Sequence, residues 1–325
     1  MACAAEKIWT IRETLSWAEE YLAGYEVPDA KTEAEYILSH VLNCKRAGLH
    51  IDFNRTIDPY ELQRFAGFVE RRIKREPSQY IIGEQEFWGL AFKVTRDVLI
   101  PRPETEILVE EAVKTVSRKS EVVSGNNMQL TTHQSRFTIL DLCTGSGCIA
   151  IILAKEIPDS QIYAVDVSEK ALNVARENAE RHSVAERITF LQGDLFELPH
   201  PSLSPLKGER TEVRGCLLEK LKFDLIISNP PYISKKMIKE LQPEVKDYEP
   251  VTALYGGDDG LDFYRRIISD TPAYLAKGGY LMLEMGCGQA EKIKNIIKQS
   301  NIFEATTIIK DFSGIDRVIK TQRKG

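Results

Sequence analysis

The chain has 325 residues, and at roughly 150 residues per domain this length predicts two domains or one large α/β domain. Hydrophobic residues make up 43% and charged residues 28% of the chain, which is typical of globular proteins and excludes disordered, collagen-like and disulfide-scaffold chains. The 48 acidic residues outnumber the 43 basic ones, giving a net charge of −5. Because proteins that bind nucleic acid usually carry a basic excess, this balance disfavours direct contact with nucleic acid.

The cysteines and the N-terminus indicate the compartment. The six cysteines are scattered, without a C-x-x-C pair or a histidine spacing typical of zinc, and we interpret them as reduced thiols. Charges come too early in the N-terminal segment for a signal peptide, and no stretch approaches about 18 uninterrupted apolar residues. We therefore expect a cytoplasmic protein that binds neither a metal ion nor a membrane.

Residues 1–78 are predicted to form a small all-α domain. Apolar residues recur at i, i+3, i+4 and i+7 spacing from Ile8 to Leu22 and again from Ala34 to Leu42. Asp29 is expected to cap the second helix, and Asp58-Pro59-Tyr60-Glu61 predicts a cap with proline in the first turn of a third. We expect this domain to recognise the substrate.

A basic cluster ends the helical region. It consists of Arg71, Arg72, Lys74 and Arg75. We interpret it as a solvated helix face. The alternative is a docking surface for a partner that is bound to RNA.

Residues 79–100 are predicted to form a β-hairpin linker, with short strands at Tyr80-Ile81-Ile82 and from Phe87 to Val94 and turns at Gly83 and Gly89. A helix is expected from Glu104 to Val116. The polar stretch from Ser117 to Arg136 has no apolar period, and we predict a mobile loop there.

From residue 137 onward, segments typical of strands and helices alternate, which predicts a largely parallel sheet with helices on both faces over residues 101–325. The expected strands are FTILDL, QIYAVDV, ITFLQGD, FDLIIS, YLMLEMG, Ala305–Ile309 and Asp316–Lys320, and the expected helices are Ile149–Glu156, Glu169–His182, Leu261–Ala276 and Gln289–Gln299. Between Leu198 and Lys222 the chain is rich in Pro, Ser and Lys and is expected to form a surface excursion.

A glycine-rich turn is expected where the first core strand meets its helix. Glycines at 145 and 147 let the backbone turn sharply and let a ligand approach closely. Gly145-x-Gly147-x-x-Ala150 also fits a dinucleotide-binding fingerprint, with Asp166 as the carboxylate that binds the ribose. The motif by itself therefore leaves a nicotinamide-type oxidoreductase open.

Two acidic residues favour a different cofactor. Asp141, at the end of the first core strand, would repel a pyrophosphate but suits the ammonium group of S-adenosylmethionine, and Asp194, after the third strand, suits an adenine amino group. The alternative interpretation is that both carboxylates only cap turns at strand ends.

A second motif, Asn229-Pro230-Pro231-Tyr232, follows the fourth core strand, where open α/β sheets bind their ligands. The two prolines remove two backbone donors, so the segment presents mainly acceptors, the Asn229 side-chain oxygen and the Pro230 carbonyl. Two acceptors at a fixed spacing match an –NH₂ group and would orient its nitrogen toward a methyl donor. Tyr232 is expected to form a wall of the pocket and to stack on a flat substrate. A plain turn is the alternative for this motif.

Taken together, these motifs resemble the class I S-adenosylmethionine-dependent methyltransferases with an N-P-P-Y motif. More narrowly, the chain resembles the release factor glutamine methyltransferases, because the segments QEFWGLAFKV, VLIPRPETE, DLCTGSGCIAI, AVDVS, GDLF, IISNPPYI and LMLEMG occur in that family's order. The resemblance implies a Rossmann-like class I methyltransferase domain with a mixed seven-stranded sheet, preceded by a small all-α domain and a β-hairpin linker.

The resemblance also implies an activity. The chain would transfer a methyl group from S-adenosylmethionine to the side-chain amide nitrogen (N5) of the glutamine in the Gly-Gly-Gln motif of class-1 peptide chain release factors, and so act on the machinery of translation termination.

The same resemblance assigns site residues. The cofactor would be wrapped by Cys143, Thr144, Gly145, Ser146 and Gly147. Asp166 would bind the ribose hydroxyls, Asp194 and Leu195 would bracket the adenine, and Asn229 to Tyr232 would receive the substrate glutamine. Many relatives have glycine in place of Cys143, so we expect a backbone conformation there that a Cβ allows. Many have tryptophan in place of Leu195, which would cost aromatic stacking on adenine.

The expected chemistry is in-line displacement without a covalent intermediate, a metal or a histidine base, since the five histidines lie outside the motifs. Roles for Arg102, Glu104 and Glu284 stay open: the first two suit either cofactor contact or an interdomain salt bridge, and the third suits a structural role. An adenine-N6 nucleic-acid methyltransferase is the main alternative, because an exocyclic –NH₂ would suit the same acceptors. A non-catalytic binding module is a further alternative.

Overall fold

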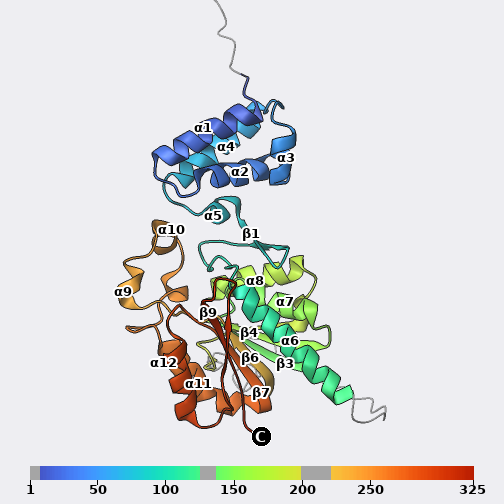
Figure 1. The fold of residues 1–325 in the computed structure, drawn as a ribbon. Helices are drawn as coiled ribbons and strands as arrows, with labels where there is room; N and C mark the ends of the chain where they lie inside the picture. The colour runs from blue at the N-terminus through green and yellow to red at the C-terminus, as the bar shows by residue number, and fades with distance from the viewer. Residues whose placement is uncertain (1–7, 125–136, 199–220) are drawn as a thin grey trace, which may run out of the picture. The chain divides into compact units, whose positions relative to one another are not determined.

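The computed structural model describes residues 8–124, 137–198 and 221–325 (Figure 1). Within them, no helix is long and apolar enough to cross a membrane. Contacts divide the chain into a helical unit, residues 8–84 with Gln242–Tyr248, and a larger unit, Gln85–Leu241 with Glu249–Gly325. We name the larger one the catalytic unit because it holds the motifs that are predicted to act in catalysis. The chain therefore leaves the catalytic unit for seven residues and then returns to it. The surface excursion predicted between Leu198 and Lys222 lies almost wholly outside the described residues.

The helical unit packs amphipathic helices around Leu22, Ile37, Leu38 and Phe65, none of which is exposed. Its helices are α1 (Ile11–Gly24), α2 (Ala30–Val41), α3 (Arg46–Ile51), α4 (Pro59–Arg72), α5 (Ser78–Ile82) and α10 (Pro243–Lys246). The small helical domain is thus confirmed.

Local details of this unit differ in part from the expectation. The cap at Asp58 is confirmed, since its side chain accepts from the Tyr60 N–H and the Glu61 side chain reaches back to the Asp58 N–H. Asp29 was expected to cap α2, but its backbone is left-handed (φ 50°) and its side chain makes no capping bond. Tyr80-Ile81-Ile82 was expected to form a strand but lies in helix α5. The prediction failed because a run of three apolar residues occurs in strands and helices alike.

The basic cluster at the end of α4 is a network of ion pairs, so the interpretation as a solvated face is wrong. Arg72 is only 3% exposed and donates to Glu33 (2.9 Å) and to Glu244 (3.0 Å). Arg75 donates to both carboxylate oxygens of Glu244, and Arg71 donates to both of Glu76. Lys74 alone of the four is fully on the surface.

The predicted hairpin is confirmed with shifted strands, β1 (Glu84–Phe87) and β2 (Leu90–Lys93). Within the catalytic unit, the side chain of Asn178, which has no exposed surface, ties β2 to the glycine-rich turn. Its oxygen accepts from the Lys93 N–H (2.7 Å), and its nitrogen donates to the carbonyls of Lys93 (3.0 Å) and Ser146 (2.9 Å).

The catalytic unit contains a seven-stranded sheet of order β5-β4-β3-β6-β7-β9-β8, which confirms the predicted fold class. β9 pairs antiparallel with both of its neighbours, β7 and β8, and the other neighbouring strands pair in parallel. The strands are β3 (Phe137–Leu142), β4 (Ser160–Asp166), β5 (Ile188–Gln192), β6 (Phe223–Ser228), β7 (Leu275–Glu284), β8 (Thr307–Lys310) and β9 (Asp316–Gln322). The unit's helices are α6 (Thr105–Ser124), α7 (Cys148–Glu156), α8 (Glu169–Arg181), α9 (Lys235–Ile238), α11 (Asp262–Tyr274) and α12 (Ala290–Ser300).

One boundary in this unit is wrong. A loop was expected from Ser117, but helix α6 continues to Ser124, because polar residues extend a helix that one apolar face already anchors. The rest of the expected loop, 125–136, lies outside the described residues.

Helices cover both faces of the sheet (Figure 1). Along β3, Ile139 packs with α6 and α7 on one face, while Leu140 and Leu142 pack with α11 and α12 on the other. Because successive side chains of a strand point to opposite faces, adjacent apolar residues such as Ile139 and Leu140 fill both layers. Both faces of the sheet are therefore covered, and the loops at the carboxyl ends of its strands are where a site is expected.

Candidate active site

A cavity of about 340 Å³ lies at the carboxyl ends of the central strands. The strand order reverses between β3 and β6, and such switch points are where open α/β sheets bind ligands. The volume lies within the ~300–1,000 Å³ typical of small-molecule sites. All of its lining residues belong to the catalytic unit. They are Asp97, Val98, Leu99, Cys143, Gly145, Val165, Asp166, Val167, Ser168, Ala171, Gly193, Asp194, Leu195, Asn229, Pro231, Pro250, Val251, Thr252, Ala253, Tyr255, Phe263 and Arg266.

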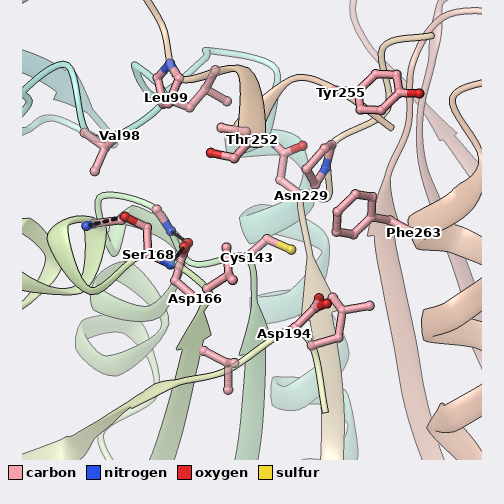
Figure 2. A pocket seen from close by; sticks show the side chains of 18 of the residues that line it. Val98, Leu99, Cys143, Asp166, Ser168, Asp194, Asn229, Thr252, Tyr255 and Phe263 are labelled. Carbon is pink, nitrogen blue, oxygen red and sulfur yellow. Dashed lines mark hydrogen bonds between the residues drawn. The ribbon is translucent and has the colours of Figure 1, made fainter. Parts of the chain in front are cut away.

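The glycine-rich turn after β3 holds the carboxylate of Asp166. The Gly145 N–H donates to Asp166 Oδ2 (2.9 Å) and the Ser168 N–H donates to Asp166 Oδ1 (2.9 Å). Burial raises the pKa of Asp166, and these two backbone donors oppose that rise. Each oxygen keeps a lone pair for a further donor, and the side chain faces the cavity in Figure 2. The arrangement therefore suits a ligand with hydroxyl groups.

Cys143 occupies a backbone position that favours glycine. Its φ is +61°, in the left-handed region that a Cβ tolerates at a cost of about 1–2 kcal/mol. The expectation of a conformation that a Cβ allows therefore holds only with strain. Figure 2 shows the sulfur at the cavity, and burial raises the pKa of the thiol far above its ordinary value, so it stays neutral.

The two carboxylates expected at the cofactor differ in position. Asp194 lines the cavity and pairs with Arg266 (2.9 Å) at a half-exposed rim, and the adjacent Leu195 also lines it. Asp141 is fully buried and does not line the cavity. Its Oδ2 accepts from the Thr144 hydroxyl (2.6 Å), whereas Oδ1 has no hydrogen-bond partner in the described part of the chain. Burial raises its pKa to about 7.

The Asn-Pro-Pro-Tyr segment contributes two residues to the cavity, Asn229 and Pro231. The Asn229 Nδ2 donates to the Thr105 hydroxyl (3.2 Å), which leaves its Oδ1 as an acceptor. Pro230 is buried. Tyr232 was expected to form a wall of the pocket, but it is not one of the residues that line this cavity.

The backbone around Tyr232 is tightly packed. The Gln289 side chain donates to the Tyr232 carbonyl (3.0 Å). A Cβ added at Gly256 would lie 2.6 Å from the Pro231 oxygen and 2.7 Å from the Tyr232 Cα, so only glycine fits there. The segment is therefore held by main-chain contacts and not only by its prolines.

Other lining residues were missed by sequence reasoning. Phe263, in α11, presents an aromatic ring at the cavity (Figure 2). A 3₁₀ turn, Val251–Ala253, forms another part of the wall, and just before it Glu249 accepts from Arg102 through both carboxylate oxygens (2.6 and 2.7 Å). No motif marks these residues, because helices and turns far away in the sequence bring them to the cavity.

Arg102 and Glu104, whose roles were left open, both make ion pairs inside the catalytic unit. Arg102 pairs with Glu249, and Glu104 pairs with Arg317 (3.3 Å). Of the remaining predicted site residues, Thr144, Ser146 and Gly147 shape the turn but do not line the cavity. Among the described residues no cluster of His, Cys, Asp and Glu could hold a metal ion.

The strand order with one antiparallel strand and the cavity at the switch point define a Rossmann-like class I methyltransferase. Comparison with family models agrees: residues 13–83 match the PrmC N-terminal domain, and residues 133–302 match a methyltransferase domain.

Relatives identify the family more narrowly. The chain is 44% identical to the release factor glutamine methyltransferase of Geobacter sulfurreducens, over 96% of each chain. It is 41% identical to that of Thermodesulfovibrio yellowstonii, over 90% of this chain and 92% of the relative. The chain belongs to the release factor glutamine methyltransferase family and is a methyltransferase, as the sequence motifs predict.

A solved structure with the same type of name is also similar. It is a protein-(glutamine-N5) methyltransferase (release factor-specific) from Alicyclobacillus acidocaldarius, 29% identical, with a TM-score of 0.37 over 72% of this chain and 100% of that chain.

Proposed function

We propose that the protein transfers a methyl group from S-adenosylmethionine to the side-chain amide nitrogen of the glutamine in the Gly-Gly-Gln motif of class-1 release factors. The observation that carries the proposal is the orientation of Asn229, whose nitrogen is engaged by Thr105 while its oxygen is left as an acceptor at the cavity. Family membership supports the substrate, since the relatives are named for it.

The cavity fits S-adenosylmethionine in the chemistry of its donor and acceptor groups. Asp166 is fixed by two backbone donors and keeps lone pairs for ribose hydroxyls. Leu195 and Phe263 offer apolar and aromatic surface for adenine, and Phe263 supplies the ring that Leu195 lacks. When bound, the cofactor supplies an electrophilic methyl group on a sulfonium.

Asp141 is proposed to act on the cofactor from behind the cavity wall. Its orphaned Oδ1 fits a cationic ligand in charge, but the side chain is fully buried. We therefore assign to Asp141 a role in holding the turn through Thr144 and in adding negative charge behind it. Cys143 to Gly147 are proposed to wrap the cofactor.

The Asn-Pro-Pro-Tyr segment is proposed to act on the acceptor amide by position. Two acceptors, Asn229 Oδ1 and the Pro230 carbonyl, would bind the two hydrogens of the –NH₂ group and align the nitrogen for in-line displacement. An amide nitrogen is a poor nucleophile because its lone pair is delocalised, so alignment and preorganised dipoles must supply the rate. The proton then leaves after methyl transfer, when the nitrogen has become acidic.

The predicted helical domain, residues 1–78, would recognise the release factor, with 79–100 as a linker to the methyltransferase domain, 101–325. The acidic net charge supports a protein partner and not nucleic acid. We place the activity in the cytoplasm, where reduced thiols and release factors are found together.

The test is labelled methyl transfer to a purified release factor. We expect label on the wild-type factor and none on a factor in which the Gly-Gly-Gln glutamine is replaced by alanine. Asn229→Ala should lower kcat by roughly 100-fold or more, since one preorganised polar group contributes about 10²–10³. Asn173→Ala, the same change on an exposed helix face, is the matched control and should keep wild-type turnover. Label on the glutamine-free factor, or a preference for adenine in DNA, would overturn the assignment.

A further inference from the structure

The start of α6, after Pro101-Arg102-Pro103, and the end of β7 each contribute a buried polar side chain near Asn229. Thr105 begins α6 and is 2% exposed, and Glu284 ends β7 and is also 2% exposed. The Thr105 hydroxyl accepts from the Asn229 Nδ2 (3.2 Å), and the same hydroxyl lowers the pKa of the Glu284 carboxyl. Thr105 thus connects Asn229, which lines the cavity, with the buried carboxyl group of Glu284.

We propose that Thr105 and Glu284 are positioning residues that fix the Asn229 side-chain amide with its oxygen, and not its nitrogen, toward the acceptor nitrogen. The inference rests on the proposed function, because it assumes that Asn229 Oδ1 receives an N–H of the substrate. It goes further in naming the groups that set the direction of that amide.

The number of hydrogens on each group limits how the Asn229 amide can be oriented. A hydroxyl has one hydrogen, and an ionised carboxylate only accepts. A Thr105 hydroxyl that donates its hydrogen to the ionised Glu284 can only accept from Asn229. It therefore pairs with the Asn229 Nδ2, as the structure has it. The flipped amide would set two oxygens without a hydrogen against each other at Thr105 and would present an –NH₂ to the substrate –NH₂.

The surroundings of Glu284 make this direction sensitive to protonation. Its Oε2 has no hydrogen-bond partner among the described residues. Burial raises its pKa to about 7, the Thr105 hydroxyl lowers it, Glu104 raises it, and Arg317 and Arg102 lower it. Tyr232 also faces the group, the Tyr264 hydroxyl donates to the Glu284 carbonyl (2.9 Å), and Cys148 lies within its field.

Protonation would release the constraint. A protonated Glu284 donates to Thr105, and the Thr105 hydrogen is then free to point at Asn229 and to accept the flipped amide. We therefore expect turnover to fall as the pH drops below about 7, because Asn229 is then held in one orientation for a smaller fraction of the time.

Three variants test the proposal, with kcat measured on a release factor and cofactor affinity measured by calorimetry. Thr105→Val keeps the shape of the side chain but removes the hydroxyl, and we expect kcat to fall roughly 10- to 100-fold with cofactor affinity within about twofold. Thr105→Ser restores the hydroxyl and should recover most of the turnover. Glu284→Gln offers Thr105 an acceptor that does not titrate, so the fall in kcat below pH 7 should disappear.

The outcomes separate this inference from the proposed function. Full turnover of Asn229→Ala would overturn the proposed function and the inference together. An inactive Asn229→Ala beside a fully active Thr105→Val would overturn the inference alone, as would a Thr105→Ser variant no better than Thr105→Val. An unchanged acid limb in Glu284→Gln would remove Glu284 from the chain, and that comparison of pH profiles is independent of whether Thr105→Val folds.

Discussion

The most deeply buried charged groups of the helical unit and of the catalytic unit differ in how they are paired. In the helical unit, Arg72 is 3% exposed and lies between the carboxylates of Glu33 and Glu244. In the catalytic unit, Asp141 and Glu284 are equally buried, and each has a carboxylate oxygen without a partner among the described residues. Burial raises the pKa of both carboxyl groups to about 7.

The difference teaches which buried charges hold the fold and which serve the site. Paired ions offset much of the cost of leaving water, and removing one partner leaves the other buried and unpaired. Orphaned carboxylates destabilise their ionised form and persist where a function requires them. The two orphans of the catalytic unit flank the glycine-rich turn and Asn229, the two places at which we propose that the ligands bind.

The largest effect is expected at Arg72. Arg72→Met should lower the free energy of unfolding of the helical unit by about 3–5 kcal/mol, because it removes a buried guanidinium from two partly buried carboxylates and leaves Glu33 without its arginine. Urea unfolding followed by the fluorescence of Trp9 and Trp17, both in this unit, measures it. The control is Arg265→Met, whose ion pairs are about half exposed and should contribute no more than about 1 kcal/mol. Equal losses of stability in the two variants would show that burial does not make the ion pairs of Arg72 more stabilising than those of Arg265.

Asp141→Asn should give the next largest change, of opposite sign. The folded pKa of about 7 is above the ordinary value of 3.8, so the folded state binds the proton more tightly, and the free energy of unfolding falls as the pH rises from about 4 to 7. The amide cannot ionise. The variant should match the wild type near pH 4 and exceed it by roughly 2–4 kcal/mol at pH 8. Asp159→Asn, on the surface, should show no such growth. A constant difference at every pH would contradict the assignment.

Asn178 tests whether orphaned polar groups are typical of the whole catalytic unit or only of its site. It is a fully buried polar group of the catalytic unit, but it is satisfied by three hydrogen bonds to Lys93 and Ser146. Asn178→Ala should therefore destabilise by about 1–3 kcal/mol, since it leaves backbone groups unpaired. Thermal unfolding measures the loss. A variant more stable than the wild type would mean that Asn178, like the orphaned carboxylates, destabilises the fold.

Cys143→Gly should have the smallest effect. Glycine relieves a left-handed backbone (φ +61°) but loses more conformational entropy on folding, and the two nearly cancel. We expect a change in the free energy of unfolding within about 1 kcal/mol, in the stabilising direction, by denaturant titration. A clear loss would mean that the packing of the thiol at the cavity outweighs the strain.

Much of the fold could be read from the sequence because its signals are local. Alternating strand and helix segments predicted the sheet, Asp58 and Glu61 predicted a capped helix that the structure contains, and the motifs at Gly145 and Asn229 predicted where the cavity lies. The errors fell where a short segment suits two conformations, as in Tyr80-Ile81-Ile82, or where polar residues extend an anchored helix, as at the end of α6.

By itself the sequence determined the fold class and the family, because strand periodicity, glycine-rich turns and proline pairs act within a few residues of the chain. Only the tertiary structure decided that Arg72 pairs with Glu244 across 172 residues of chain, that Thr105 receives the Asn229 amide across 124, and that Asp141 lies behind the cavity wall. The partner of a buried polar group depends on which strands and helices meet in the folded chain. Only there is the group removed from water, so that the lack of a partner costs free energy.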